Sequence, residues 1–227
     1  MSFRSDYLNI HEQAYQRLRH EGKSSWSETE DFLERVDFFS AILKEYFSHK
    51  PAKVMILGCG DGETAIALGK LGHEVIGIDI SPTAIQWATE KARNANSPVT
   101  FRQANIAEAL NLDSSVDAII DDHCLHCIVG EDRRRALQNV FSHLKTGGIF
   151  VARTHCGDPP TSAGEEFLKM WDTESRCQVH NGVAGRYFGK PGDILGEIEA
   201  AGFFLEESRI FTYPNEWEML EVVARKK

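Results

Sequence analysis

Apolar residues in the first fifty positions recur at the spacing of an amphipathic helix. Residues 8–19 place Ala14 and Leu18 on one face. Within 28–47 the apolar positions fall three or four residues apart, at Phe32, Val36, Phe39, Leu43 and Phe47. This spacing predicts two helices, the second closed by Pro51.

After Pro51, short apolar runs alternate with helical patterns. The runs predict buried strands at 53–57, 74–78, 99–102, 116–120 and 149–153. Helices are predicted at 63–71, after Ser81 and at 132–144. Ser81 followed by Pro82 is a favoured helix start, because serine caps the free N–H groups and proline suits the first turn. The alternation predicts a parallel sheet covered by helices on both faces.

The last third of the chain departs from this rhythm. Residues 156–192 are rich in glycine and proline and predict an irregular insertion. A helix at 193–201 and two strands at 204–211 and 219–224 follow. The short turn near Pro214 and Asn215 predicts that these two strands pair in antiparallel fashion.

Composition narrows the class of protein. The chain has 227 residues, 42% hydrophobic and 26% charged, as expected for one α/β domain. Its net charge of −9 argues against a broad electrostatic grip on nucleic acid. We expect no membrane segment, since no apolar run reaches about 18 residues. Five scattered cysteines and an N-terminus without the apolar core of a signal peptide predict a cytoplasmic protein with reduced thiols.

The strongest motif joins the first strand to the next helix. It reads Gly58-Cys59-Gly60-Asp61-Gly62, and Asp79 ends the following strand. Glycines allow a tight turn and the close approach of a ligand, and a carboxylate at the second strand end accepts hydrogen bonds from ribose hydroxyls. An ordinary tight turn and a surface aspartate are the alternatives.

Several motifs in order resemble the class I S-adenosylmethionine-dependent methyltransferases. The glycine motif is similar to the first of that family. The later matches are Gly77-Ile78-Asp79-Ile80-Ser81, Gln103-Ala104-Asn105-Ile106, Asp117-Ala118-Ile119-Ile120-Asp121, Leu144-Lys145-Thr146-Gly147-Gly148 and Ala201-Gly202-Phe203. The resemblance implies a Rossmann-like, doubly wound α/β fold with seven strands, mostly parallel, and the last strand antiparallel. Residues 1–50 would form a helical cap, and 51–227 the cofactor domain with a substrate-capping insertion at about 156–192.

The same resemblance implies a cofactor, S-adenosylmethionine, leaving as S-adenosylhomocysteine, and a set of contacts. Gly58, Cys59 and Gly60 would lie under its methionine part, and Asp121 near the methionine amino group. Asp79 would hold the ribose. Ile80 and Ile106 would sandwich the adenine, and the side-chain carbonyl of Asn105 would accept from the adenine amine.

Polar residues at the ends of the fourth and fifth strands are the candidates for chemistry. His126, His123 and His155 are candidate bases, because imidazole titrates near neutrality. Asp122 is a candidate to orient one of them or to receive a substrate amine, with a solvated loop carboxylate as the alternative. His126 is the first choice, with a rate expected to rise through an ordinary pKa of about 6 to 7. The alternative for each histidine is simple packing.

The cysteines raise a metal alternative. Cys124, Cys127, Cys177 and His180 have ligand types that suit zinc. Asp122-His123 also resembles the strand end of magnesium-binding catechol-type enzymes, but their second acidic partner is replaced by Thr154-His155. We therefore predict no metal site.

Two other functions compete with methyl transfer to a small molecule. A nicotinamide-dependent oxidoreductase also needs a glycine turn and a strand-end acid, although Glu63 stands where it prefers a small residue. A non-catalytic cofactor-binding regulator is the second. The acceptor, the methylated atom and the oligomeric state stay open, with no nucleic-acid or membrane partner expected. Trp26, Arg186, Tyr187 and Phe188 are candidates to line the acceptor pocket.

Overall fold

The computed structural model describes residues 8–23, 25–26, 32–110, 115–212 and 214–227. Its elements, in chain order, are α1 (Leu8–His20), α2 (Phe32–Tyr46), β1 (Lys53–Leu57), α3 (Glu63–Lys70), β2 (Glu74–Asp79), α4 (Pro82–Asn94), β3 (Thr100–Gln103), β4 (Val116–Asp122), the 3-10 helix η2 (Leu125–Cys127), α5 (Glu131–His143), β5 (Leu144–Cys156), α6 (Glu165–Met170), β6 (Trp171–Asp172), β7 (Cys177–His180), β8 (Val183–Tyr187), α7 (Pro191–Ala200), β9 (Phe204–Phe211) and β10 (Glu218–Arg225).

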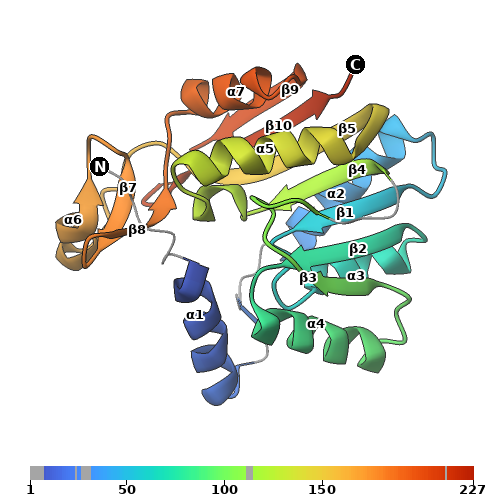
Figure 1. Ribbon diagram of the computed structural model, residues 1–227, viewed down its shortest axis with the longest axis horizontal. Coiled ribbons are helices and arrows are strands. Elements are labelled where there is room, and N and C mark those ends of the chain that lie inside the picture. The colour runs from blue at the N-terminus through green and yellow to red at the C-terminus, as the bar shows by residue number, and fades with distance from the viewer. Residues whose placement is uncertain (1–7, 24, 27–31, 111–114, 213) are drawn as a thin grey trace.

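A seven-stranded sheet forms the centre of the molecule (Figure 1). Its order is β3-β2-β1-β4-β5-β10-β9. The pairs from β3 to β5 are parallel, and β10 pairs antiparallel with both β5 and β9. The predicted fold class, with its antiparallel last strand, is confirmed.

Helices cover both faces of this sheet, so its strands read as continuous apolar runs. One core joins α5 and α7 to a face that carries Met55, Leu57, Ile119 and Phe150. The other joins α2 and α3 to the opposite face, with Val54, Ile56, Ala118 and Ile120. Strands that are buried on both faces cannot show a polar alternation, which explains the runs found in the sequence.

The predicted boundaries hold to within a few residues where the pattern was periodic. Ser81 caps α4 as predicted, since its Oγ accepts from the N–H of Ala84 at 2.9 Å. The predicted start of the second helix, at 28, lies outside the described residues, and α2 begins at Phe32 in the described part.

The expectation of an irregular insertion was wrong. Between β5 and α7 the chain forms α6 and a three-stranded sheet of order β6-β7-β8, antiparallel throughout. The strands are too short and too polar for periodicity to reveal them. In Figure 1 this small sheet stands beside the main one, at the side of α5 and β10 where η2 lies.

The strand order also fixes where a ligand can bind. β1 lies between β2 and β4, so the connections leave it in opposite directions and separate helices at its carboxyl end. Such a switch point is where open α/β sheets bind ligands. Both the glycine motif and the histidine-rich segment follow strands that end there.

Candidate functional site

A cavity of about 1020 Å³ opens at the carboxyl ends of β1, β2, β4 and β5. Three parts of the chain enclose it. The floor is the strand ends, α1 and α2 cover one side, and the insertion and the β9–β10 turn supply Pro160, Ser162, Arg186 and Trp217. The volume is at the upper end of the range for small-molecule sites.

The glycine motif forms one wall, and glycine is required there. Gly58 and Gly60 have φ of 53° and 56°, a conformation that other residues rarely adopt. A Cβ on Gly58 would lie 2.6 Å from the side chain of Cys124, and one on Gly60 would lie 2.7 Å from the Tyr15 hydroxyl. Cys59 lines the cavity between them, and its N–H bonds to the Ile78 carbonyl at 2.9 Å.

Asp79 closes this loop from the end of β2. Its Oδ2 accepts from the N–H of Gly60 and its Oδ1 from the N–H of Ser81, both at 2.9 Å. The carboxylate is buried yet lines the cavity. Burial raises the pKa of Asp79 to about 6, against the opposing pull of the backbone N–H groups of Ser81, Gly60 and Ile80. Each oxygen keeps a lone pair for a ligand hydroxyl.

The residues predicted to meet the adenine line the same wall. Ile80, Asn105 and Ile106 face the cavity together with Ala104. Asn105 already has local partners: its Oδ1 accepts from Ala107 N–H at 3.0 Å and its Nδ2 donates to Glu108 at 3.1 Å. The amide is therefore held in place, with one carbonyl lone pair left.

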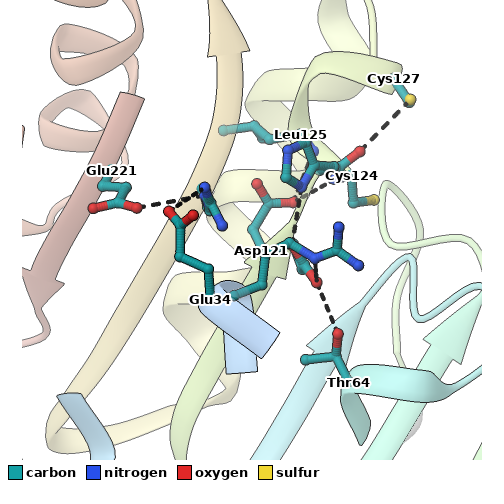
Figure 2. Close-up of polar contacts among 11 residues, drawn as sticks. Glu34, Thr64, Asp121, Cys124, Leu125, Cys127 and Glu221 are labelled. Carbon is teal, nitrogen blue, oxygen red and sulfur yellow. Dashed lines mark hydrogen bonds and ion pairs between the residues drawn. The ribbon is translucent and has the colours of Figure 1, made fainter. Parts of the chain in front are cut away.

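Asp121 is placed differently from the others. It is fully buried and is not among the described residues that line the cavity. Its Oδ1 accepts from the N–H groups of Cys124 and Leu125, at 3.0 and 2.7 Å, as Figure 2 shows. Its Oδ2 has no hydrogen-bond partner among the described residues. These bonds hold the turn from β4 into η2. Burial raises the pKa of Asp121 to about 7, so the carboxyl is partly protonated near neutral pH.

Asp122 is a carboxylate at the end of β4 that lines the cavity. Its Oδ2 accepts from Thr64 Oγ1 at 2.8 Å and lies 3.5 Å from Arg35 Nε, while its Oδ1 meets His123 Nδ1 at 2.9 Å. Burial favours a higher pKa, but His123, Arg35 and Thr64 together hold the pKa of Asp122 below its usual value. Asp122 therefore stays ionised and orients His123, the role predicted for it.

The three candidate histidines form one cluster. Ring centroids lie 4.9 Å apart for His123 and His155, 5.0 Å for His126 and His155, and 6.2 Å for His123 and His126. All three line the cavity. His123 has φ of 65°, a strained conformation that turns the chain sharply at the end of β4.

The expected titration of His126 between pH 6 and 7 was wrong. The ring is buried, and its Nδ1 has no hydrogen-bond partner among the described residues. Burial lowers the pKa of His126 well below its ordinary value, helped by His155 and the positive charge of Arg186. The imidazole is therefore neutral throughout the physiological range, the form that accepts a proton.

The candidate zinc ligands do not form a metal-binding group in the described chain. Burial raises the pKa of Cys127 to about 11 and holds the pKa of Cys124 well above its ordinary value. Cys177 packs in a separate small core, and exposed His180 meets the sulfur of Met170 at 3.4 Å. Within the ranges that the structure describes, no three His, Cys, Asp or Glu side chains are placed so that they could hold a metal ion.

Several cavity residues escaped sequence reasoning because they come from distant segments. From α1, Tyr15 packs against Trp26 with ring centroids 4.5 Å apart and planes tilted by 44°, and both side chains line the cavity. Glu12 accepts from Ser81 Oγ and Thr83 Oγ1, each at 2.5 Å, and so fastens α1 to the start of α4. A helical pattern predicts that α1 packs somewhere, but not where.

Of the arginines that line the cavity, Arg186 was predicted, whereas Arg35 and Arg153 were not. Arg153 on β5 is buried, lines the cavity and approaches Glu34 at 3.2 Å and Glu221 at 3.4 Å, both labelled in Figure 2. Of the four predicted lining residues, Trp26 and Arg186 face the cavity. Tyr187 instead packs under Arg133, and Phe188 is buried behind Trp217.

A glycine loop, a strand-end acid and an apolar adenine wall at a sheet switch point define a Rossmann-like protein built to hold a nucleoside cofactor. A family described as a methyltransferase domain matches residues 48–202, which is more than half of the chain. The chain belongs to this family, and the predicted membership of the class I S-adenosylmethionine-dependent methyltransferases is confirmed.

Individual relatives agree with this assignment. A putative methyltransferase, YqeM of Bacillus subtilis, is 28% identical over 52% of this chain and 54% of its own. A 2-heptyl-1-hydroxyquinolin-4(1H)-one methyltransferase of Mycobacteroides abscessus is 32% identical over 43% and 44%. The chain thus spans about half the length of these curated relatives.

A solved structure shares the whole fold. The 1,6-didemethyltoxoflavin-N1-methyltransferase of Burkholderia thailandensis, with its substrate and S-adenosylhomocysteine bound, gives a TM-score of 0.73. It is 20% identical, and the superposition covers 100% of this chain and 92% of that one.

Within the described residues no helix is long and apolar enough to cross a bilayer.

Proposed function

We propose that this protein transfers a methyl group from S-adenosylmethionine to a small-molecule acceptor. The observation that carries the proposal is a single cavity lined by two chemically distinct groups of residues. They are the glycine loop with Asp79, and the cluster of His123, His126 and His155. A cofactor held by the first group would meet an acceptor held by the second.

The residues present fit this cofactor. The positive φ and absent Cβ of Gly58 and Gly60 keep the backbone open beside Asp79, whose two oxygens each have capacity for a ribose hydroxyl. Ile80 and Ile106 offer apolar surface for the adenine, and Asn105 a fixed carbonyl. The unpartnered Oδ2 of Asp121 fits a role toward the methionine amino group, although a side chain or the η2 turn must first shift to expose it.

The bound cofactor would supply an activated methyl group, so the protein needs to position an acceptor, exclude water and remove a proton. His126, neutral and lining the cavity, is the proposed acceptor of that proton, and an anionic acceptor beside Arg186 would offset the positive charge that lowers its pKa. Ionised Asp122 holds the ring of His123 and anchors the start of α3 through Thr64. The cap, residues 1–50, and the insertion, residues 156–192, would shield the reacting atoms, since both contribute lining residues.

The cavity favours a small acceptor over a macromolecule. It is enclosed by α1, α2 and the insertion instead of opening on a basic groove, and the net charge of −9 opposes nucleic acid. The relatives named for hydroxyquinolone and didemethyltoxoflavin methylation act on compounds of this size. Five free thiols in the described chain support a cytoplasmic location, which stays a prediction.

Two measurements test the proposal against its rivals. Thermal unfolding with S-adenosylhomocysteine should show stabilisation that NAD does not reproduce, whereas stabilisation by NAD alone would favour the oxidoreductase. Methyl transfer from labelled S-adenosylmethionine to a panel of small acceptors should then be detected, and His126→Gln should lower its rate strongly. Cofactor binding without any transfer across a broad panel would favour the regulator.

A further inference from the structure

Arg186 gives the acceptor side of the cavity an uncompensated positive charge. It lies on β8 of the small sheet and lines the cavity. No carboxylate lies within ion-pair distance of it in the part of the chain that the structure describes. Arginine is always charged, so a half-buried guanidinium without a counter-ion favours an anionic ligand.

The other arginines that line the cavity differ in this respect. Arg35 lies 3.5 Å from Asp122, and Arg153 lies between Glu34 and Glu221. Their charges are balanced by the protein itself. Arg186 is therefore the cation on this surface that a ligand is left to neutralise.

The groups next to Arg186 are polar but neutral. They are His126, His11 and Cys127, and the guanidinium charge itself helps to keep both imidazoles unprotonated. Buried nitrogens of both histidines, Nδ1 of His126 and Nε2 of His11, have no hydrogen-bond partner among the described residues. His11 already bonds the backbone of Cys127, which uses the single N–H of its neutral ring, whereas Nδ1 of His126 can present an N–H to an anion beside the guanidinium.

Aromatic surface adjoins this group. Trp217 lines the cavity and stacks on Phe188, with centroids 3.8 Å apart and planes at 13°. Phe188 stacks in turn on His126 at 5.8 Å, and it follows Arg186 closely on the same segment. Arg186 and Trp217 thus line the same cavity, which offers a ligand both a cation and an aromatic side chain.

We propose that the methyl acceptor is a planar aromatic acid whose carboxylate binds Arg186, with Nδ1 of His126 donating to the same group. This inference rests on the proposed function, because it names the substrate class of that site. A carboxylate matches the planar fork of a guanidinium, which binds it through two hydrogen bonds.

Matched pairs of probes test the charge requirement. Benzoate, indole-3-carboxylate and quinoline-4-carboxylate are titrated, each beside its neutral carboxamide, into protein saturated with S-adenosylhomocysteine. Calorimetry and ligand-observed NMR report the affinities. We expect at least one acid to bind about tenfold or more tightly than its amide, the usual scale of a charge-assisted pair.

Variants locate the effect. Arg186→Gln should remove the preference for the acid, Arg186→Lys should keep part of it, and Arg209→Gln, which deletes an exposed arginine of β9, should leave it unchanged. Equal binding of acid and amide in all three pairs, no binding of any acid at millimolar concentration, or a preference that survives Arg186→Gln would each overturn the inference.

The same experiment also measures cofactor binding, which tests the proposed function separately. Affinity for S-adenosylhomocysteine should be the same in wild type and Arg186→Gln. If wild type fails to bind it, the proposed function fails, while the acid-against-amide comparison in the cofactor-free protein still tests Arg186.

Discussion

The buried carboxyl of Asp121 makes a prediction about stability that can be worked out from its surroundings. Replacing it by asparagine keeps an oxygen to accept from Cys124 and Leu125 N–H groups, and removes only the titration of the unpartnered Oδ2. The shape is conserved, so packing changes little. The variant therefore isolates the cost of placing a negative charge at this position.

The magnitude follows from the pKa. Burial raises the pKa of Asp121 from 3.8 to about 7. Since the folded state holds the proton more tightly, this group stabilises the fold at low pH, and that contribution is lost as pH rises from about 4 to about 7. The whole effect is about 4 kcal/mol, and roughly 2–3 kcal/mol of it falls between about pH 5 and pH 8.

Urea unfolding at the two pH values measures it. Relative to wild type, Asp121→Asn should gain roughly 2–3 kcal/mol in free energy of unfolding on going from about pH 5 to pH 8, or about 1 M in midpoint. Asp37→Asn on the exposed face of α2 removes the same formal charge and serves as control. Parallel pH profiles of Asp121→Asn and wild type would refute the reasoning and show that Asp121 is ionised in the fold.

Three further results are expected. Asp79→Asn should weaken S-adenosylhomocysteine binding by about 1.5–3 kcal/mol. Wild-type affinity should fall as pH drops below about 6, because protonated Asp79 loses an acceptor for the ribose. An affinity that calorimetry finds unchanged in the variant would remove Asp79 from the site. His126→Gln should lower turnover roughly 10²- to 10⁴-fold, and wild-type turnover should show no rise attributable to His126 between about pH 6 and 8, since its pKa lies well below that window; a sigmoidal rise lost in the variant would contradict this. Glu12→Gln should destabilise the protein by about 1 kcal/mol and speed proteolysis within α1, because it weakens the attachment to Ser81 and Thr83; a wild-type cleavage rate would show that other contacts hold α1.

The fold was predictable wherever one or two residues mark the start or end of an element. Ser81-Pro82 marks the start of α4, and the glycine after Leu57 marks the end of β1, because capping and positive φ depend on single residues. The small sheet of β6, β7 and β8 has no such signal. Its strands have two to five residues, fewer than a period-two pattern needs to stand out.

The cofactor side of the site was predictable for a related reason, and the acceptor side only in part. Asp79 and Asn105 end or follow strands, so topology alone carries them to the switch point. Tyr15 and Arg35 arrive through tertiary packing of separate segments, which no local spacing encodes. The ordinary pKa expected for His126 failed because desolvation is a property of the folded environment, and the sequence does not specify it.

The insertion of β10 between β5 and β9 has a consequence for biosynthesis. β9 pairs only with β10 within the described chain, and the exposed edge of β5 is completed by the same strand. While the polypeptide is still being made, β1 to β5 are free to assemble, but β9 has no hydrogen-bonding neighbour until residues 218–225 leave the ribosome. The nascent chain therefore passes through an interval in which the β5 edge is open to pairing with another chain, and a ribosome-bound intermediate stalled before β10 should be a substrate for chaperones.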